Sequence, residues 1–524
     1  MAKDLFRPCF VAQDAQAYGR HGLLDEVPWI PIVTAPAPYS KDDWLAAMLA
    51  WIQHAERNSS SIRRCELWGE QKSDGALMYR CIRRLLPRRT HIDSGMLQEC
   101  AIYTENDDAT VVYTTLRNSA QETEAPDGEM LHRARTQQDY PQDASQVPYY
   151  HPAVRALAFH YRAAQCCVQI DMIPFPGTGN IAQDARLGRT ALSLLRLMHQ
   201  HSYGHATSYV KRVEHDILVP RDAYQDLYLA LRTRYAGELI RTWAEVTDPK
   251  KHVFEDIGIA TWLILLWRSM FSQGAAPGGF VDVGCGNGLL VHILTLEGYR
   301  GYGFDARARR SWAQYREHGA DLQTCMLDAA EIVSREASPF PRGAFLIGNH
   351  ADELTPWLPL LATSTQACAG YINIPCCAWT LDGTRFVPTQ YTLDRKKVAE
   401  WVTGAHLGGQ DPVMPPAPHT AISEDANVLL QHTLWFFERM VAAPEQAVSK
   451  HFAYYAYIAT LHLRAGWVLE TEALRIPSTK NWTLVARRKI GTDAASTARL
   501  DVHYSALVQE ARAVQTRIPA PSHE

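Results

Sequence analysis

The sequence lacks several features that would assign it to a specialised class of protein. Its 11 cysteines include no C-x-x-C pair, and two pairs are directly adjacent, at Cys166–Cys167 and Cys376–Cys377. This spacing matches no zinc motif, and an odd number of scattered cysteines argues against the disulfide framework of a secreted domain. We therefore expect no metal site and a reducing compartment.

Long apolar runs are also missing. The most apolar stretch, Ile257–Trp267, has about half the length that a membrane-spanning helix needs. The first residues lack the apolar core of a signal peptide. The 52 basic and 56 acidic residues give a net charge of −4, which excludes a chain that is basic throughout but permits a local basic face. We expect a soluble, cytoplasmic protein without membrane association.

The chain has 524 residues and is 47% hydrophobic, which predicts two or three globular domains, and we find no internal repeat. Changes in composition suggest the domain boundaries. We expect an N-terminal α+β region over residues 1–125, a linker over 126–146, a middle α+β region over 147–244, an α/β domain over 245–490 with an insertion over 379–426, and a frayed C-terminal tail over 491–524.

Helix starts are clear at two places. Ser40 is suited to cap a helix that begins at Lys41, and Asp248 is suited to cap one that has Pro249 at its first position. Between these helices, arginines cluster in pairs at Arg63–Arg64, Arg83–Arg84 and Arg88–Arg89.

The decisive motif is FVDVGCGNGLLVHIL, over Phe280–Leu294, which predicts a strand, a glycine-rich turn and a helix. A dinucleotide-binding fingerprint would place its third glycine at position 289, which is Leu289. The pattern D-x-G-x-G-x-G instead resembles motif I of class I S-adenosylmethionine-dependent methyltransferases. We expect this turn to bind the cofactor, through Gly284, Gly286, Asn287 and Gly288.

The surrounding segments alternate between strands and helices and close on an antiparallel hairpin. This order predicts a Rossmann-like, doubly wound α/β sheet, as in class I methyltransferases, preceded by an N-terminal α+β extension. Asp305 ends the second strand, where a carboxylate can accept hydrogen bonds from both ribose hydroxyls. Asp282 could orient the cofactor's ammonium. Asp328 either binds the adenine amine or caps the next helix.

A dense polar cluster follows the fourth strand. In open α/β sheets, ligands lie beyond the carboxyl ends of the strands, so we expect Asn349 to contribute to cofactor binding there. Methyl transfer requires the nucleophile to stand behind the methyl group, and a ribose hydroxyl gains from a base. His350, Asp352 and Glu353 are the candidate bases. Alternatively, the two carboxylates cap a helix and the histidine fills a polar niche.

The loop RIPSTKNW, which joins the last two strands, contains Arg475 and Lys480. Either these cations hold a phosphate of a substrate, or the loop is a plain hairpin connection. Cys376 and Cys377 end the fifth strand in the sequence NIPCC, and such cysteines are more often buried small residues than nucleophiles.

Taken together, several blocks resemble the eukaryotic tRNA (uracil-2′-O-)-methyltransferases that modify serine tRNA. They are YVKRVEHDILVP (Tyr209–Pro220), KHVFEDIGIATWLILLW (Lys251–Trp267), FVDVGCGNGLLVHIL, EGYRGYGFDARARRSW (Glu297–Trp312), LIGNHADELTPWLP (Leu346–Pro359), NIPCC and RIPSTKNW. The resemblance implies S-adenosylmethionine-dependent 2′-O-methylation of the uridine at position 44 of serine tRNA, in the cytoplasm. The first 150 residues add little to it.

The resemblance also places functional positions. It maps the turn glycines, Asp282 and Asp305 onto the cofactor site, and residues 349–353 onto the catalytic segment. Independently of the resemblance, basic residues gather at four places, which are Arg186/Arg189, Lys211–Arg212, Arg307/Arg309/Arg310 and Arg395–Lys397. We therefore expect residues 147–244 to be an RNA-binding extension with Lys211 and Arg212 as RNA contacts; alternatively, each short cluster is a solvated face. The Lys-Asp-Lys-Glu tetrad of another family of ribose methyltransferases has no counterpart here, so the identity of the base stays open.

Two other functions fit parts of the pattern. The same cofactor site could serve a methyltransferase for a small molecule or a protein. The fold could also belong to a catalytically silent RNA-binding module, because fold does not imply activity.

Overall fold

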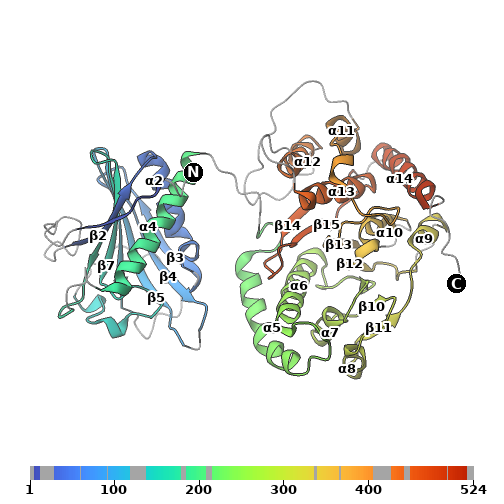
Figure 1. Cartoon of the computed structure of the whole chain (residues 1–524), viewed down its shortest axis with the longest axis horizontal. Helices are drawn as coiled ribbons and strands as arrows, with labels where there is room; N and C mark the ends of the chain where they lie inside the picture. The colour runs from blue at the N-terminus through green and yellow to red at the C-terminus, as the bar shows by residue number, and fades with distance from the viewer. Residues whose placement is uncertain are drawn as a thin grey trace. The chain divides into compact units, whose positions relative to one another are not determined.

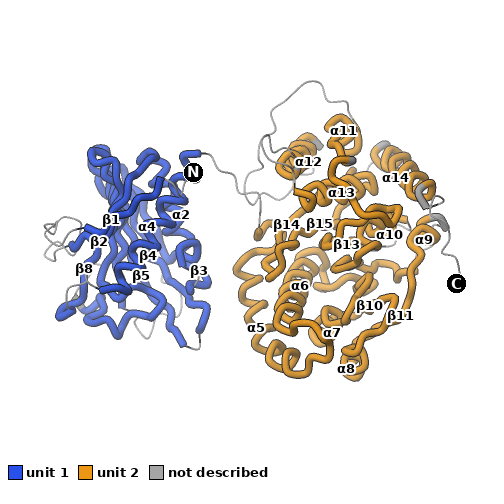
Figure 2. The backbone as a smooth tube through the Cα atoms, in the orientation of Figure 1, with its two compact units in different colours: residues 1–210 blue, residues 211–524 orange. Residues whose placement is uncertain are grey.

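The computed structural model describes residues 5–11, 29–59, 61–90, 92–117, 137–178, 184–207, 215–335, 339–364, 368–404, 426–441, 449–491 and 494–515. The chain forms two compact units, residues 1–210 (unit 1) and residues 211–524 (unit 2), which are coloured separately in Figure 2. Among the described residues, no helix is both long and apolar enough to cross a membrane.

Unit 1 is built on one antiparallel sheet with the strand order β1-β2-β8-β7-β6-β5-β4-β3. Its strands are β1 (Cys9–Phe10), β2 (Ile30–Pro36), β3 (Ile62–Lys72), β4 (Leu77–Pro87), β5 (Met96–Glu105), β6 (Asp108–Leu116), β7 (Ala156–Arg162) and β8 (Cys167–Ile173). Helices α2 (Lys41–Gln53) and α4 (Ala185–Ala206) pack on this sheet and share its apolar core (Figure 1). Ser40 caps α2 as predicted, in a capping box with Asp43.

The boundary predicted from composition at residues 126–146 is corrected by this sheet. Strand β7 pairs with β6 along its length, and β8 pairs with both β7 and β2. The first part of the predicted middle region therefore completes the N-terminal sheet, and the chain divides near residue 210. Of the predicted linker, residues 137–146 contain two short 3₁₀ turns, η2 (Gln137–Asp139) and η3 (Ala144–Gln146), and the rest lies outside the described residues.

Unit 2 has the predicted doubly wound sheet, with the strand order β11-β10-β9-β12-β13-β15-β14. Its strands are β9 (Phe280–Val283), β10 (Gly301–Asp305), β11 (Asp321–Thr324), β12 (Phe345–Asn349), β13 (Gly370–Ile374), β14 (Glu470–Ala473) and β15 (Trp482–Ala486). The first five are mutually parallel, and β15 runs antiparallel to both β13 and β14. This confirms the predicted fold class, including the terminal antiparallel hairpin.

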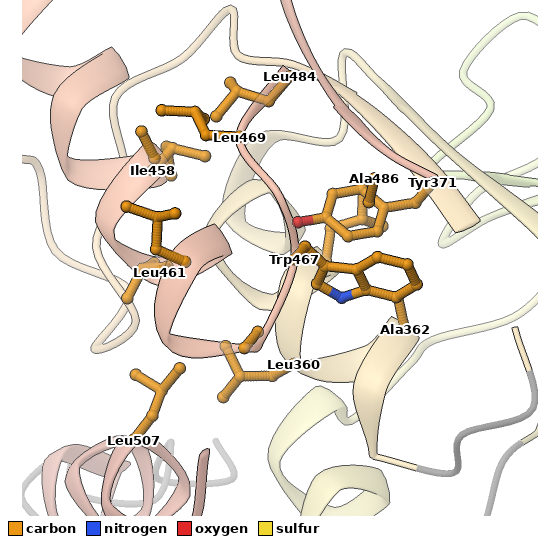
Figure 3. Packing of buried hydrophobic residues seen from close by; sticks show 14 of the residues in the cluster. Leu360, Ala362, Tyr371, Ile458, Leu461, Trp467, Leu469, Leu484, Ala486 and Leu507 are labelled. Carbon is orange, nitrogen blue, oxygen red and sulfur yellow. The ribbon is translucent and has the colours of Figure 1, made fainter. Parts of the chain in front are cut away.

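Helices cover both faces of this sheet. One apolar cluster joins the sheet to α5 (Arg221–Arg241), α6 (Pro249–Met270), α7 (Leu289–Leu296) and α8 (Ser311–Glu317). The other joins it to α9 (Ala329–Arg335), α10 (Leu358–Thr363), α11 (Arg395–Thr403), α12 (Ala426–Val441), α13 (Lys450–Arg464) and α14 (Ala494–Gln515). Figure 3 shows part of this second cluster, where Tyr371 of β13 lies beside Trp467. Of the predicted insertion, α11 is ordered in the second cluster, and residues 405–425 lie outside the described residues.

The predicted frayed tail is wrong for residues 494–515, which form α14. Leu500, Leu507 and Ala511 recur at helical spacing and are buried against the second cluster. Figure 3 shows Leu507 of this face. This apolar face makes the helix part of the core, whereas residues 516–524 lie outside the described residues.

Candidate active site

The glycine-rich turn connects β9 to α7 at the carboxyl edge of the sheet. Gly284, Gly286 and Gly288 have φ angles of 76°, 55° and 76°, a region that residues with a side chain rarely adopt. A Cβ atom at 288 would lie 2.7 Å from a methyl group of Leu322, whereas one at 286 would meet nothing within 4 Å. The turn is thus closely packed on one side and leaves room at Gly286.

Asp305, the last residue of the neighbouring strand β10, holds the turn. One oxygen of its carboxylate accepts a hydrogen bond from the Gly286 amide at 3.0 Å, and the other accepts one from the Arg307 amide at 3.1 Å. The Arg309 guanidinium lies 3.7 Å away, and the Asp305 side chain is 16% exposed. The carboxylate therefore stays at the surface of the site with lone pairs free for a ligand.

Two side chains that the sequence reasoning missed support the turn from behind. The Ser311 hydroxyl donates to the Asn287 carbonyl at 2.7 Å, and the Trp312 indole donates to the Gly286 carbonyl at 2.9 Å. Asn287 uses its own side chain to accept from the Leu289 amide at the start of α7. These bonds leave the opposite side of the turn, where Gly286 is open, as the side that can receive a ligand.

Three further carboxylates are buried beside the turn. Asp282 lies on β9, and Glu255 and Asp256 lie on α6; all three are less than 9% exposed. Burial and the charge of Asp305 raise the pKa of Asp282 to about 8. Burial and the charges of Glu255 and Asp282 raise the pKa of Asp256 well above its usual range. We call Glu255, Asp256, Asp282 and Asp305 the acidic cluster.

The acidic cluster has few internal partners. Asp282 Oδ1 is buried and accepts no hydrogen bond from any described residue, and no described cation pairs with Asp256. Sequence reasoning identified Asp282 but missed Glu255 and Asp256. The sequence does carry a signal for both residues, because they are two adjacent acids beside the apolar run of α6. Acidic side chains are rarely buried unless they have a partner or a functional role.

The predicted catalytic segment lies against the turn. A Cβ atom added at Gly284 would approach Ala351 Cα to 3.4 Å, so the ends of β9 and β12 meet at one edge. His350 and Asp352 flank Ala351 with φ angles of 58° and 43°, which is uncommon for residues with side chains and often marks functional sites. Asn349 is buried, and its Oδ1 atom accepts no hydrogen bond from a described residue.

The three candidate bases differ in their surroundings. His350 is half-exposed, with Nε2 3.8 Å from Glu255 Oε1. Desolvation and the charge of His252 lower its pKa, so the imidazole is neutral near pH 7. Asp352 is exposed and lies close to Cys376 and Cys377, with one carboxylate oxygen and the two sulfurs within 4.8 Å of one another. Glu353 is exposed at the start of the 3₁₀ turn η5 (Asp352–Trp357).

Burial raises the pKa of Cys376 to about 12, and burial together with a hydrogen bond to Asp352 raises that of Cys377. Both groups are therefore thiols at neutral pH. This agrees with the interpretation that they are not nucleophiles.

The other predicted contacts have partners within the chain. Asp328 accepts from the Glu331 amide at 2.9 Å, which is the helix-capping alternative. Arg475 forms a bidentate ion pair with Asp216, and the Lys480 ammonium donates to the Cys376 carbonyl. The structure thus supplies partners for both cations of the loop between β14 and β15. Lys211 and Arg212 lie outside the described residues.

These residues fit S-adenosylmethionine. The cofactor carries a sulfonium, an ammonium and a ribose diol, and the acidic cluster offers a buried, unpartnered carboxylate oxygen on Asp282 and an accessible carboxylate on Asp305. The open side of Gly286 provides the close backbone approach that a nucleoside needs. Asp282 would face the cationic end and Asp305 the ribose.

Known proteins resemble both units of the chain. Residues 9–212 match a family model described as a TRM44-like, N-terminal bet v1-like domain, and residues 218–330 match one described as a predicted AdoMet-dependent methyltransferase. The tRNA (uracil-O(2)-)-methyltransferase of Neurospora crassa is 36% identical over 442 residues, which cover 79% of this chain and 73% of the relative. That of Schizosaccharomyces pombe is 30% identical over 515 residues, with 90% and 88% covered.

Proposed function

Because this chain belongs to the tRNA (uracil-O(2)-)-methyltransferase family, we propose that it methylates the 2′-hydroxyl of uridine 44 in serine tRNA. Its cofactor is S-adenosylmethionine, which the methyltransferase unit implies. The observation that carries the proposal is the meeting of the acidic cluster, the glycine turn and the segment 349–353 at one edge of the sheet. We also propose a cytoplasmic location, since all 11 cysteines are free thiols.

The cofactor supplies an activated methyl group. In the reaction, the bond between O2′ and the methyl carbon forms while the bond between that carbon and sulfur breaks. The ribose hydroxyl must also lose its proton. The chain's task is to align the hydroxyl and to accept this proton.

We assign the proton acceptor to His350. Its neutral imidazole is half-exposed at the edge where substrate would approach, and its backbone has the left-handed conformation that often marks functional sites. Once protonated, the imidazolium would face Glu255, whose carboxylate lies 3.8 Å away. Asp352, beside it in the same strained segment, would then orient the ribose hydroxyl.

The test uses an unmodified serine tRNA transcript and methyl-labelled S-adenosylmethionine, followed by nuclease digestion and mass mapping. We expect one labelled 2′-O-methyluridine, at position 44. A matched transcript with deoxyuridine at this position lacks the acceptor hydroxyl and should take up no label. Label on a base, at another nucleotide, or only on protein would contradict the proposal, and absence of label would favour a silent RNA-binding module.

A further inference from the structure

Unit 1 contains a cavity of about 310 Å³ that the methyl-transfer reaction does not use. It lies between α4 and the strands β4, β5, β6 and β7, and this volume is at the lower end for sites that hold a small molecule. Its inner wall is aromatic and aliphatic, with Tyr113, Phe159, Leu85 and Leu157. Tyr113 and Phe159 are in edge contact, with ring centroids 5.1 Å apart.

The charge of this cavity is entirely positive. Arg83, Arg186 and Arg189 line it, and no aspartate or glutamate is among the described residues that do so. Arg83 is 2% exposed, whereas Arg186 and Arg189 are exposed on the first turns of α4. The cavity therefore extends from the surface into the core of unit 1 with a cation at each end.

Arg83 lies on the core face of β4, which also presents Tyr79, Cys81 and Leu85. An apolar side chain would be expected at this position. Arg83 pairs across the sheet with Gln98 of β5. Its guanidinium donates to Gln98 Oε1 and to the carbonyl groups that end α2, and it lies 4.5 Å from the centre of the Tyr113 ring. All of these hydrogen-bond partners are neutral, and no described carboxylate forms an ion pair with Arg83.

A buried histidine fixes this arrangement. Burial lowers the pKa of His151 to about 4, so the ring is neutral. Its Nδ1 atom lies 2.8 Å from the Pro152 carbonyl, which can only accept, so Nδ1 carries the proton. The other nitrogen then accepts from the Gln98 amide at 2.9 Å, and this turns Gln98 Oε1 toward Arg83. The chain thus holds the cation in a defined position.

The Tyr113 hydroxyl is the second sign that the cavity takes a ligand. It lines the cavity, the residue is 3% exposed, and the oxygen makes no hydrogen bond to a described residue. Buried hydroxyls almost always have a partner, because desolvation without one is costly. At the mouth, Arg189 likewise makes no hydrogen bond or ion pair with a described residue. The Arg186 guanidinium lies over the Tyr149 ring and donates one hydrogen bond to the Tyr149 carbonyl at 2.9 Å, which leaves its other N–H groups for a ligand.

We propose that this cavity binds a single nucleotide. Its base would enter the aromatic inner part, where the Tyr113 hydroxyl meets a polar atom of its edge and Arg83 supplies the positive field. Its phosphate would lie between Arg186 and Arg189 at the mouth, because paired guanidinium groups bind phosphate in a fixed geometry. That the nucleotide belongs to an RNA strand rests on the proposed function; that the cavity takes a nucleotide does not.

The first experiment measures the binding of uridine 5′-monophosphate to the intact chain by calorimetry. We expect the Arg186→Gln/Arg189→Gln variant to bind about a hundredfold more weakly, at about tenfold for each charged hydrogen bond lost. Arg196→Gln is the matched control, since Arg196 is exposed on the same helix but does not line the cavity. Uridine, which lacks the phosphate, should bind as weakly to the unsubstituted chain as the nucleotide does to the double variant.

The second variant, Tyr113→Phe, removes only the hydroxyl. It should weaken nucleotide binding about fivefold without lowering the midpoint of unfolding, because the hydroxyl has no described partner to lose. Equal affinity of the unsubstituted chain, the double variant and Tyr113→Phe for the nucleotide would overturn the proposal. Equal affinity for uridine and its monophosphate would overturn the assignment of the phosphate to the arginines.

A third measurement separates the source of the nucleotide from the proposed function. If the nucleotide belongs to the RNA substrate, the double variant should also bind tRNA more weakly and show a raised KM for tRNA, with kcat nearly kept. Unchanged tRNA binding with weakened binding of the monophosphate would overturn the RNA source and leave a free nucleotide as the ligand. Methyl transfer without any nucleotide binding would overturn the inference alone, and nucleotide binding without methyl transfer would overturn only the proposed function.

Discussion

The two units bury ionisable groups of opposite kind, acids in unit 2 and an arginine in unit 1, at the places where we expect ligands. In unit 2 the acidic cluster gathers carboxylates beside the glycine turn, and Asp282 keeps an oxygen without a described partner. In unit 1 the cavity under α4 contains a buried arginine whose partners are all neutral. Burying an unpaired charge costs several kcal/mol, so each arrangement needs a compensating gain. A cationic cofactor would supply it in unit 2, and an anionic nucleotide in unit 1.

The two units also differ in how they stabilise a buried ionisable group before a ligand binds. The carboxylates of unit 2 can neutralise themselves by binding protons, and their raised pKa values indicate that they do so in part. Arginine cannot lose its proton in proteins, so unit 1 surrounds Arg83 with oriented dipoles and an aromatic face. We therefore expect pH to control ligand binding in unit 2 and to have little effect in unit 1.

The largest expected effect is on the rate of methyl transfer in unit 2. Substitution of His350 by glutamine should lower the single-turnover rate of methyl transfer about a thousandfold, because general base catalysis contributes about 10²–10⁴. Cofactor affinity should be nearly unchanged. His318→Gln is the control, since this histidine is exposed beyond the end of α8. A near-normal rate in His350→Gln would move the role of base to Asp352.

Cofactor affinity should respond next most strongly. Asp305→Asn removes a charged acceptor from the site and from the Gly286 amide, and we expect the dissociation constant for S-adenosylmethionine to rise about a hundredfold. Asp321→Asn, on the neighbouring strand β11, alters an exposed carboxylate that is bonded to Gln323 and should change nothing. Unchanged cofactor affinity in Asp305→Asn would remove Asp305 from the site. Nucleotide binding to unit 1 should be the same in both variants.

The pH dependence gives a smaller effect. With a pKa of about 8, Asp282 is mostly neutral at pH 7 and mostly charged at pH 9. A cationic ligand prefers the charged form, so affinity for S-adenosylmethionine should rise about tenfold across this range, with proton release on binding below pH 8. Folding stability should instead fall as the pH rises from the ordinary aspartate pKa to about 8. Over this range the folded state keeps a proton on Asp282 that the unfolded state has released. Calorimetry in buffers of different ionisation enthalpy measures the released proton. Asp282→Asn should reduce both the release and the slope, and Asp256, whose pKa is also raised, accounts for any remainder. An unchanged slope in this variant contradicts the assignment.

The smallest expected difference is in the response to salt. Arg186 and Arg189 are exposed, so raising the salt concentration from 50 to 500 mM should weaken binding of uridine 5′-monophosphate several-fold by screening. Asp282 is buried, and binding of S-adenosylmethionine should change less. Equal salt dependence for the two ligands would contradict the proposal that the phosphate site in unit 1 is exposed and that Asp282 binds its ligand in a buried site.

Local patterns in the sequence predicted much of unit 2. The strand, glycine turn and acidic strand end lie within 26 residues, from Phe280 to Asp305, and a parallel sheet brings their ends together by its topology. The cap at Ser40 is local in the same way. The roles assigned to the site residues remain predictions that the variants above would test.

Features that depend on distant parts of the chain could not be predicted. The pairing of β7 with β6 crosses a polar segment that composition marks as a boundary, and only the hydrogen bonds reveal one sheet. Asp256 and Asp282 are neighbours through the packing of α6 on β9, which no spacing encodes. Arg83 gives no sign in the sequence that it points into the core, since Arg84 beside it stacks on Trp68 on the other face.

The most direct test of the two opposite charges titrates three proteins with both ligands under one set of conditions: the unsubstituted chain, Asp305→Asn, and Arg186→Gln/Arg189→Gln. We predict that Asp305→Asn loses affinity for S-adenosylmethionine alone and that the arginine variant loses affinity for uridine 5′-monophosphate alone. If either variant lost both ligands, or if neither variant lost its own, the account of two separate sites selected by buried charge would be contradicted.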